Sequence, residues 1–199
     1  MSSISDAKVL GGIGAILVLL AAVPNIGWLF GIAGFVMILL AIRNISQAVG
    51  DNKIYNNMLI AVVLGIGAIA VGTVTVVGAI VHVLGMGTFV GSRFVPPTHL
   101  VVGDWLGLAV AVIGGLLAVW ALLVASAVFL RRTYSSMASK LNVKMFDTAG
   151  LLYLIGAATA IIGVGFIVIL VAEILLAVSF FSIPEQPHIV QAQPVSNMS

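Results

Sequence analysis

Residues 148–183 read TAGLLYLIGAATAIIGVGFIVILVAEILLAVSFFSI, and this stretch decides the class of fold. Its single charged residue is Glu173. About 20 apolar residues are enough for a helix to cross the ~30 Å hydrocarbon core of a bilayer. One helix over the whole stretch would extend about 54 Å, and the sequence Gly163-Val164-Gly165 interrupts it near the middle. We therefore expect a helical hairpin, with helices over 147–162 and 166–183.

Three other apolar blocks occur in the chain, and the first repeats this pattern. Residues 9–42 are also too long for one crossing, and Pro24-Asn25 interrupts them near the middle. Proline removes a backbone donor there and asparagine favours a turn. The six spans expected are 6–23, 26–45, 55–84, 104–130, 147–162 and 166–183. The sequence thus predicts an all-α, polytopic transmembrane helical bundle of about six spans, with two helical hairpins, over residues 1–183.

The composition supports a membrane protein. Of 199 residues, 62% are hydrophobic and 7% are charged, and the mean hydropathy is +1.29. A soluble domain is about one quarter charged, and disordered chains are poor in apolar residues. Both classes are therefore excluded. The net charge of +2 is too small to suggest nucleic acid as a partner, so the expected partner is the lipid bilayer.

The distribution of basic residues predicts the orientation. With six spans, seven of the eight Lys and Arg residues share one side of the membrane with both termini, and Arg93 lies on the other. Basic residues favour the cytoplasmic side, so we expect a multi-pass protein of the cell membrane with both termini in the cytoplasm. Four long helices with the termini outside would still place six basic residues inside. Charge therefore barely separates the two topologies, and helix length and Pro24 favour six spans.

Two segments outside the apolar blocks carry further expectations. Residues 131–146 place Tyr134, Met137 and Leu141 at helical spacing with basic residues between them. This pattern predicts a segment that lies in the cytoplasmic interface. The tail over 184–199 contains three prolines and is expected to be flexible and cytoplasmic.

Glu173 is the one polar residue that the span assignment places deep in the membrane. An ionised carboxylate there costs about 3 kcal/mol on insertion scales, so the group must be protonated, paired or exposed to water. Counting outward from the turn near Val164 puts Tyr153 at a similar depth, where its hydroxyl can donate to the carboxyl. Two interpretations are open: a hydrogen bond that is purely structural, and a candidate intramembrane polar site for a proton or cation.

Small residues at four-residue spacing form a second candidate feature. The candidate helix-packing stripe consists of Gly103, Gly107, Ala111 and Gly115. In lipid, such residues allow helix backbones to approach closely. The stripe predicts either packing within the bundle or an interface to a second copy or a larger membrane complex.

The sequence motifs do not predict catalysis. The chain has no Cys, and it has no metalloprotease, nucleophile-elbow or phosphate-loop motif. We therefore expect no catalytic residues, no cofactor and no metal site. The function predicted first is a non-enzymatic scaffold, accessory subunit or self-associating bundle. The alternative is a small proton- or ion-coupled transporter or channel centred on Glu173.

Several stretches resemble one family of archaeal membrane proteins, grouped as domain of unknown function 996. These are residues 10–14, Gly50-Asp51 with Ile54-Tyr55 and Asn57, residues 148–157 and residues 174–182. The resemblance implies an archaeal source and no assigned activity. It also implies an apolar or aromatic residue at the position of Glu173 in most members, so a mechanism common to the family would not depend on Glu173.

Overall fold

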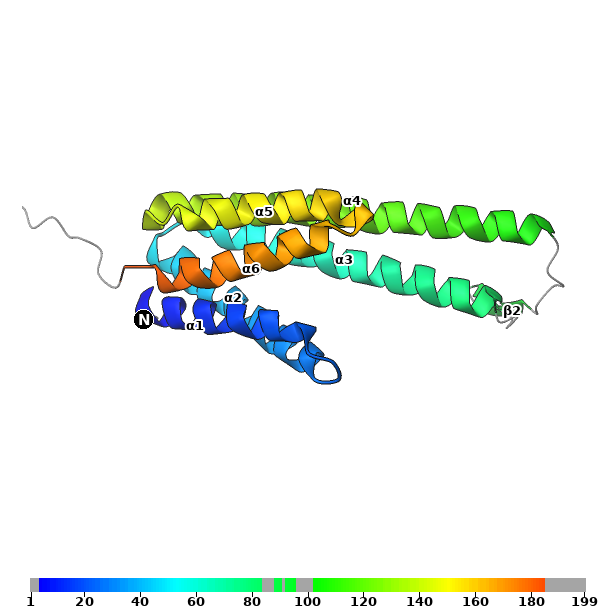
Figure 1. The fold of residues 1–199 in the computed structure, drawn as a ribbon, viewed down its shortest axis with the longest axis horizontal. Helices are drawn as coiled ribbons and strands as arrows, with labels where there is room; N and C mark the ends of the chain where they lie inside the picture. The colour runs from blue at the N-terminus through cyan, green and yellow to red at the C-terminus, as the bar shows by residue number, and fades with distance from the viewer. Residues whose placement is uncertain (1–3, 84–87, 91, 96–101, 185–199) are drawn as a thin grey trace, which may run out of the picture.

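The computed structural model describes residues 4–83, 88–90, 92–95 and 102–184, which form six helices and one short β-hairpin (Figure 1). In chain order the elements are α1 (Ile4–Leu19), the 3₁₀ turn η1 (Leu20–Ala22), α2 (Gly27–Ala48), α3 (Asn52–Val83), β1 (Thr88–Val90), β2 (Arg93–Val95), α4 (Val102–Leu141), α5 (Met145–Thr159), the 3₁₀ turn η2 (Ala160–Ile162) and α6 (Gly165–Phe181). Five helices are long and apolar enough to cross a membrane, and α6 is a shorter apolar helix. The predicted all-α bundle with two helical hairpins is confirmed.

Both predicted breaks in the long apolar blocks are turns between antiparallel helices. In each hairpin the first helix tightens into a 3₁₀ turn before the chain reverses. Asn25 adopts a φ of 68° in the first turn, and Gly163 adopts a φ of 82° in the second. Asparagine and glycine are the residues that tolerate this left-handed conformation. The chain therefore reverses direction at the two predicted breaks, and in each turn one of the residues expected there adopts the left-handed conformation.

The α2–α3 and α4–α5 connections share one geometry. Gly50 and Asn142 have positive φ values of 67° and 56°. The closing backbone bonds run from Asp51 N to Ser46 O (3.0 Å) and from Val143 N to Ala138 O (3.1 Å). A positive φ followed by a bond spanning five residues is the Schellman ending of a helix. Each turn therefore ends one helix sharply and starts the next within a few residues.

Helix α4 continues without a break to Leu141, so residues 131–141 are the last turns of a long helix, and their position in the cytoplasmic interface stays a prediction. Tyr134, Met137 and Leu141 are buried in the bundle. The Thr133 hydroxyl donates to Ile54 O of α3 (3.3 Å). The spacing of apolar residues that suggests an interfacial helix is also the spacing of a helix face buried by its neighbours. Packing against α3 and α5 covers that face here.

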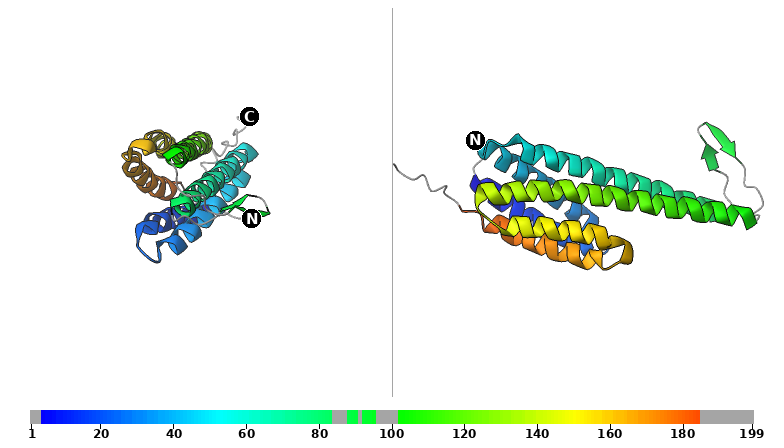
Figure 2. Two further views of the ribbon diagram at one scale, coloured as in Figure 1. Left: turned by 90° about the vertical axis from the view of Figure 1, so that its right-hand side faces the viewer. Right: turned by 90° about the horizontal axis from the view of Figure 1, so that it is seen from above.

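The core lies toward the end of the bundle that carries Ile4 of α1 and the α2–α3 and α4–α5 turns. Every buried residue described in α3 precedes Ile69, and every one described in α4 follows Ala125. The largest fully buried apolar side chains are Phe146, Phe180, Ile42, Ile45, Ile54, Met58, Met137, Leu176 and Ile183. Figure 2 shows α3 and α4 continuing past both hairpins as a pair. The molecule is thus thick at one end and only two helices wide at the other.

The segment between α3 and α4 contains a feature that the sequence did not predict. Strands β1 and β2 pair antiparallel, with Phe89 opposite Phe94. The predicted flexible tail lies outside the described residues apart from Pro184.

Candidate functional site

Glu173 of α6 and Tyr153 of α5 face each other inside the bundle. The Tyr153 hydroxyl and the Glu173 carboxyl are joined by a side-chain hydrogen bond. The second carboxyl oxygen, Oε2, is buried and has no hydrogen-bond partner among the described residues. Both side chains are half-buried as a whole. The carboxyl therefore has one satisfied oxygen and one unsatisfied oxygen, a rare arrangement for a buried polar group.

Tyr134 of α4 is a third member of this cluster. Its ring centroid lies 6.0 Å from that of Tyr153 and 6.4 Å from that of Phe146. Phe146 in turn meets Phe180 edge to face, with centroids 5.1 Å apart and an interplanar angle of 85°. Offset and edge-to-face aromatic pairs add stability beyond the area they bury. An aromatic column from α4, α5 and α6 thus borders the carboxyl.

Small residues bring these helices close enough for the cluster to form. A Cβ at Gly150 of α5 would lie 3.1 Å from Arg131 Cα and 3.2 Å from Tyr134 Cβ on α4. A Cβ at Gly156 of α5 would lie 3.0 Å from Gly165 O on α6. Side chains at these glycines would push the backbones apart. The sequence therefore positions the carboxyl and the two phenols through the glycines of α5.

The cluster lies toward the end of α4 that joins α5. Gly150 packs against Arg131, and Tyr153 is one turn farther along α5. From Arg131, helix α4 continues for about 29 residues to Val102, which is about 43 Å. Glu173 is central in α6, yet it lies far from the distal ends of α3 and α4.

A double-mutant cycle is expected to isolate the Tyr153–Glu173 hydrogen bond. Tyr153→Phe should lower the free energy of unfolding by about 1–3 kcal/mol, because it leaves a buried carboxyl oxygen without its donor. In a Glu173→Leu background the same change should have little effect, because no carboxyl remains. Denaturant unfolding in mild detergent measures both. Equal losses in the two backgrounds would show that the hydroxyl does not act through Glu173.

The predicted helix-packing stripe is distributed over more than one face of α4. A Cβ at Gly115 would collide with the Thr75 side chain of α3, whereas one at Gly107 would meet no atom within 4 Å. Ala111 is exposed, and Gly103 lies in the first turn of α4. Four-residue steps advance about 40° around a helix of 3.6 residues per turn. Gly115 therefore packs inside the bundle, and an interface at Gly107 and Ala111 stays a prediction.

Leucine substitutions at two positions of the stripe are expected to distinguish a packed position, Gly115, from an open position, Gly107. Gly115→Leu should lower the free energy of unfolding by about 1–3 kcal/mol, because the β-branched Thr75 side chain could move aside only by losing its hydrogen bond to Val71 O. Gly107→Leu should change it by less than about 0.5 kcal/mol. Thermal unfolding of the two variants in one detergent measures the difference. Similar losses at both positions would contradict this account of α3–α4 packing.

Other close helix contacts involve glycines whose partners cannot be found from periodicity within one helix. A Cβ at Gly14 of α1 would lie 2.8 Å from Gly34 O of α2. Gly11 of α1 accommodates the ring of Phe180 of α6. In the sequence these partners are separated by 20 residues or by most of the chain, so only the fold pairs them.

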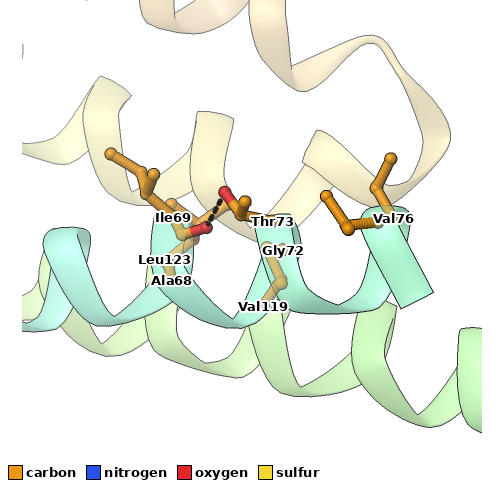
Figure 3. Close-up of a pocket in the computed structure, with 8 residues that line it drawn as sticks. Ala68, Ile69, Gly72, Thr73, Val76, Val119 and Leu123 are labelled. Atoms are coloured by element: carbon orange, nitrogen blue, oxygen red, sulfur yellow. Dashed lines mark hydrogen bonds between the residues drawn. The ribbon is translucent and has the colours of Figure 1, made fainter. Parts of the chain in front are cut away.

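Two apolar grooves open on the side of the bundle. One, of about 530 Å³, lies between α2, α3 and α4 and is lined by Gly31, Ile32, Phe35, Met58, Ala61, Val62, Gly65, Ile66, Ile69, Leu123, Ser126 and Leu130. The other, of about 490 Å³, runs along α3 and α4 (Figure 3). Figure 3 shows the Thr73 hydroxyl bonded to Ile69 O (2.8 Å). Neither groove includes Glu173. Within the described residues, no group of three His, Cys, Asp or Glu side chains forms a metal site.

Comparisons with known proteins agree on one family. The family model described as "Protein of unknown function (DUF996)" matches residues 30–174. An uncharacterised protein of the archaeon Methanocaldococcus jannaschii is 34% identical over 189 residues, which cover 92% of this chain and 94% of that protein. No solved structure matches. The matched region contains α3, α4, α5 and most of α2 and α6. The chain therefore belongs to the DUF996 family of archaeal integral membrane proteins.

Proposed function

We propose that this protein is a non-enzymatic membrane scaffold or accessory subunit that acts through its apolar helix surfaces. The observation that carries the proposal is the chemistry of the two lateral grooves. Their linings are apolar except for Thr73 and Ser126. Helix surfaces of this kind associate in lipid by close packing.

The hydroxyl groups of the grooves support this proposal because each bonds within the chain. Thr73 donates to Ile69 O, and Ser126 donates to Ala61 O at 2.8 Å. Hydroxyls that are satisfied in this way offer little to a polar substrate. A hydrophobic helix or a hydrocarbon chain is the kind of partner that such surfaces fit.

Native mass measurement after extraction in mild detergent tests this proposal. We expect either more than one copy of the chain or a second protein in a stable complex. A harsh detergent should release the single chain, which provides the control for specific association. A strict monomer without a co-purifying protein in the mild detergent would contradict the scaffold function.

A second candidate function rests on the unsatisfied Oε2 atom of Glu173. A buried carboxyl oxygen without a donor can exchange a proton or hold a cation, and ionisable residues inside membranes mark ion pathways in many proteins. A proton-flux assay in liposomes tests this function. The parent protein should conduct and Glu173→Gln should not, while Gly107→Leu serves as a matched surface control. Absence of flux in the parent protein would eliminate this candidate.

A further inference from the structure

The α5–α6 hairpin ends partway along α4. The indole Nε1 of Trp120 in α4 donates to Ala158 O (3.1 Å), close to the end of α5. From Trp120, helix α4 continues for about 18 residues to Val102, which is about 27 Å. Figure 1 and the right view of Figure 2 show the α1–α2 hairpin also ending well short of the far ends of α3 and α4. Among the residues that the structure describes, the distal part of the α3–α4 pair therefore has no helical neighbours.

The uncovered part of α3 and α4 has the surface of a protein in hydrocarbon. Val74 is 75% exposed and Leu106 is 71% exposed. The sequence has no charged residue between Met58 and Val81, or between Trp105 and Leu130. Soluble proteins rarely expose so large an apolar surface to water. The bilayer must therefore extend along this pair, beyond the tips of the hairpins.

The tip of the α5–α6 hairpin is itself apolar. Ile162 is 70% exposed and Phe166 is 66% exposed, and no polar side chain occurs between Thr159 and Glu173. Part of the turn's backbone bonds internally, with Gly163 N donating to Ala160 O at 3.0 Å and Ile167 N donating to Val164 O at 3.1 Å. Such internal bonds lower the cost of placing a turn in hydrocarbon, where no water is present to bond the backbone. These features fit a turn that ends inside the bilayer better than one among headgroups.

We infer that α3 and α4 cross the bilayer while both hairpins end within it, so that the protein is a wedge fitted to a curved lipid surface. A helix with its side chains is about 10–11 Å across. Six helices then occupy about 500 Å² in one leaflet, and two occupy about 170 Å² in the other.

This difference in area between the two leaflets determines which membrane curvature the protein prefers. The leaflet that holds six helices is expanded relative to the opposite leaflet. A bilayer relieves that mismatch by bending, so that the face carrying the chain termini becomes convex. The protein should therefore concentrate where the membrane is convex on that face, and at high density it should bend a flat membrane in the same direction.

The depth of the hairpin tip is the first test. The chain lacks cysteine, so Val164→Cys and Ile162→Cys each give one site for a fluorophore in liposomes of phosphatidylcholine. Lipids that carry a nitroxide near the headgroup or near the chain end quench at different depths. We expect chain-end lipids to quench both tip sites several-fold more strongly than headgroup lipids do.

A site at the far end of α4 provides the matched control. Leu106→Cys, which is exposed like the tip residues, should show the reverse preference because it lies near the distal surface. Tip sites that are quenched like Leu106→Cys would show that the hairpins cross the bilayer. That result would overturn the wedge.

Sorting between flat and curved membranes is the second test. Giant phosphatidylcholine vesicles contain Lys140→Cys protein, and an impermeant dye marks only copies whose termini face outward. In a tube pulled from such a vesicle the outer face is strongly convex. We expect a several-fold higher density of marked protein in the tube than in the flat membrane. Equal density or depletion in the tube would overturn the curvature preference, whatever the tip depth.

Discussion

Gly165→Leu is expected to cause one of the largest losses of stability in the chain, about 3 kcal/mol or more. A Cβ at Gly165 would overlap Gly156 O and would lie 2.6 Å from Ala160 Cα. These are backbone atoms of α5 and η2, so the clash cannot be relieved by a rotamer change. The two helices would have to separate at their turn and break the packing that places Glu173 beside Tyr153. Denaturant unfolding in mild detergent measures the loss.

Gly78→Leu is the matched control for this substitution. Gly78 lies in α3, and a Cβ there would meet no atom within 4 Å. The same gain in side-chain volume should therefore leave the free energy of unfolding within about 0.5 kcal/mol of the parent value. If Gly165→Leu were as stable as Gly78→Leu, the close approach of α5 and α6 would be incorrect.

Phe180→Ala is the second large effect, with an expected loss of about 3–5 kcal/mol. The Phe180 side chain is fully buried and meets Phe146 edge to face. Its removal leaves a cavity at the point where α6 contacts both α1 and α5. Phe166→Ala is the control, because Phe166 is exposed on the hairpin tip. Thermal unfolding should show a clearly larger loss of stability for Phe180→Ala than for Phe166→Ala.

Gly11→Ala tests the contact between Gly11 and Phe180 by adding a side-chain atom instead of removing the ring. A Cβ at Gly11 would overlap the Phe180 ring, so Gly11→Ala should destabilise the parent protein. In the Phe180→Ala background the ring is absent, and Gly11→Ala should be tolerated or should partly fill the cavity. Such non-additivity is the signature of direct contact. Additive losses would place the two residues apart.

The sequence predicts the hairpins well because helix length and turn chemistry act locally. Blocks too long for one crossing have few ways to reverse, and Asn25 and Gly163 are residues that allow the backbone to do so. The end of α4 could not be predicted in this way. An interfacial helix and a helix buried by its neighbours have the same spacing of apolar residues, and Tyr134, Met137 and Leu141 follow that spacing. Only the packing of α3 and α5 decides between the two.

The candidate site was predictable in part for the same reason. Counting from the turn places Tyr153 and Glu173 at a similar depth, since α5 ends at that turn and α6 begins there. Tyr134 could not be found from the sequence, because the residue spacing around it also fits a helix in the membrane interface. The pairing of Gly14 with Gly34 likewise depends on how two helices cross, which periodicity within either helix does not record.

We expect one bundle that exposes both termini and the α4–α5 turn on the cytoplasmic side and the β1–β2 hairpin on the other. Single cysteines at Ser5, Lys140 and Ser92, which are all exposed, test it in intact cells with a membrane-impermeant thiol reagent. Ser92→Cys should be labelled in intact cells, whereas Ser5→Cys and Lys140→Cys should react only after the cells are opened. Labelling of Ser5→Cys or Lys140→Cys in intact cells would contradict it.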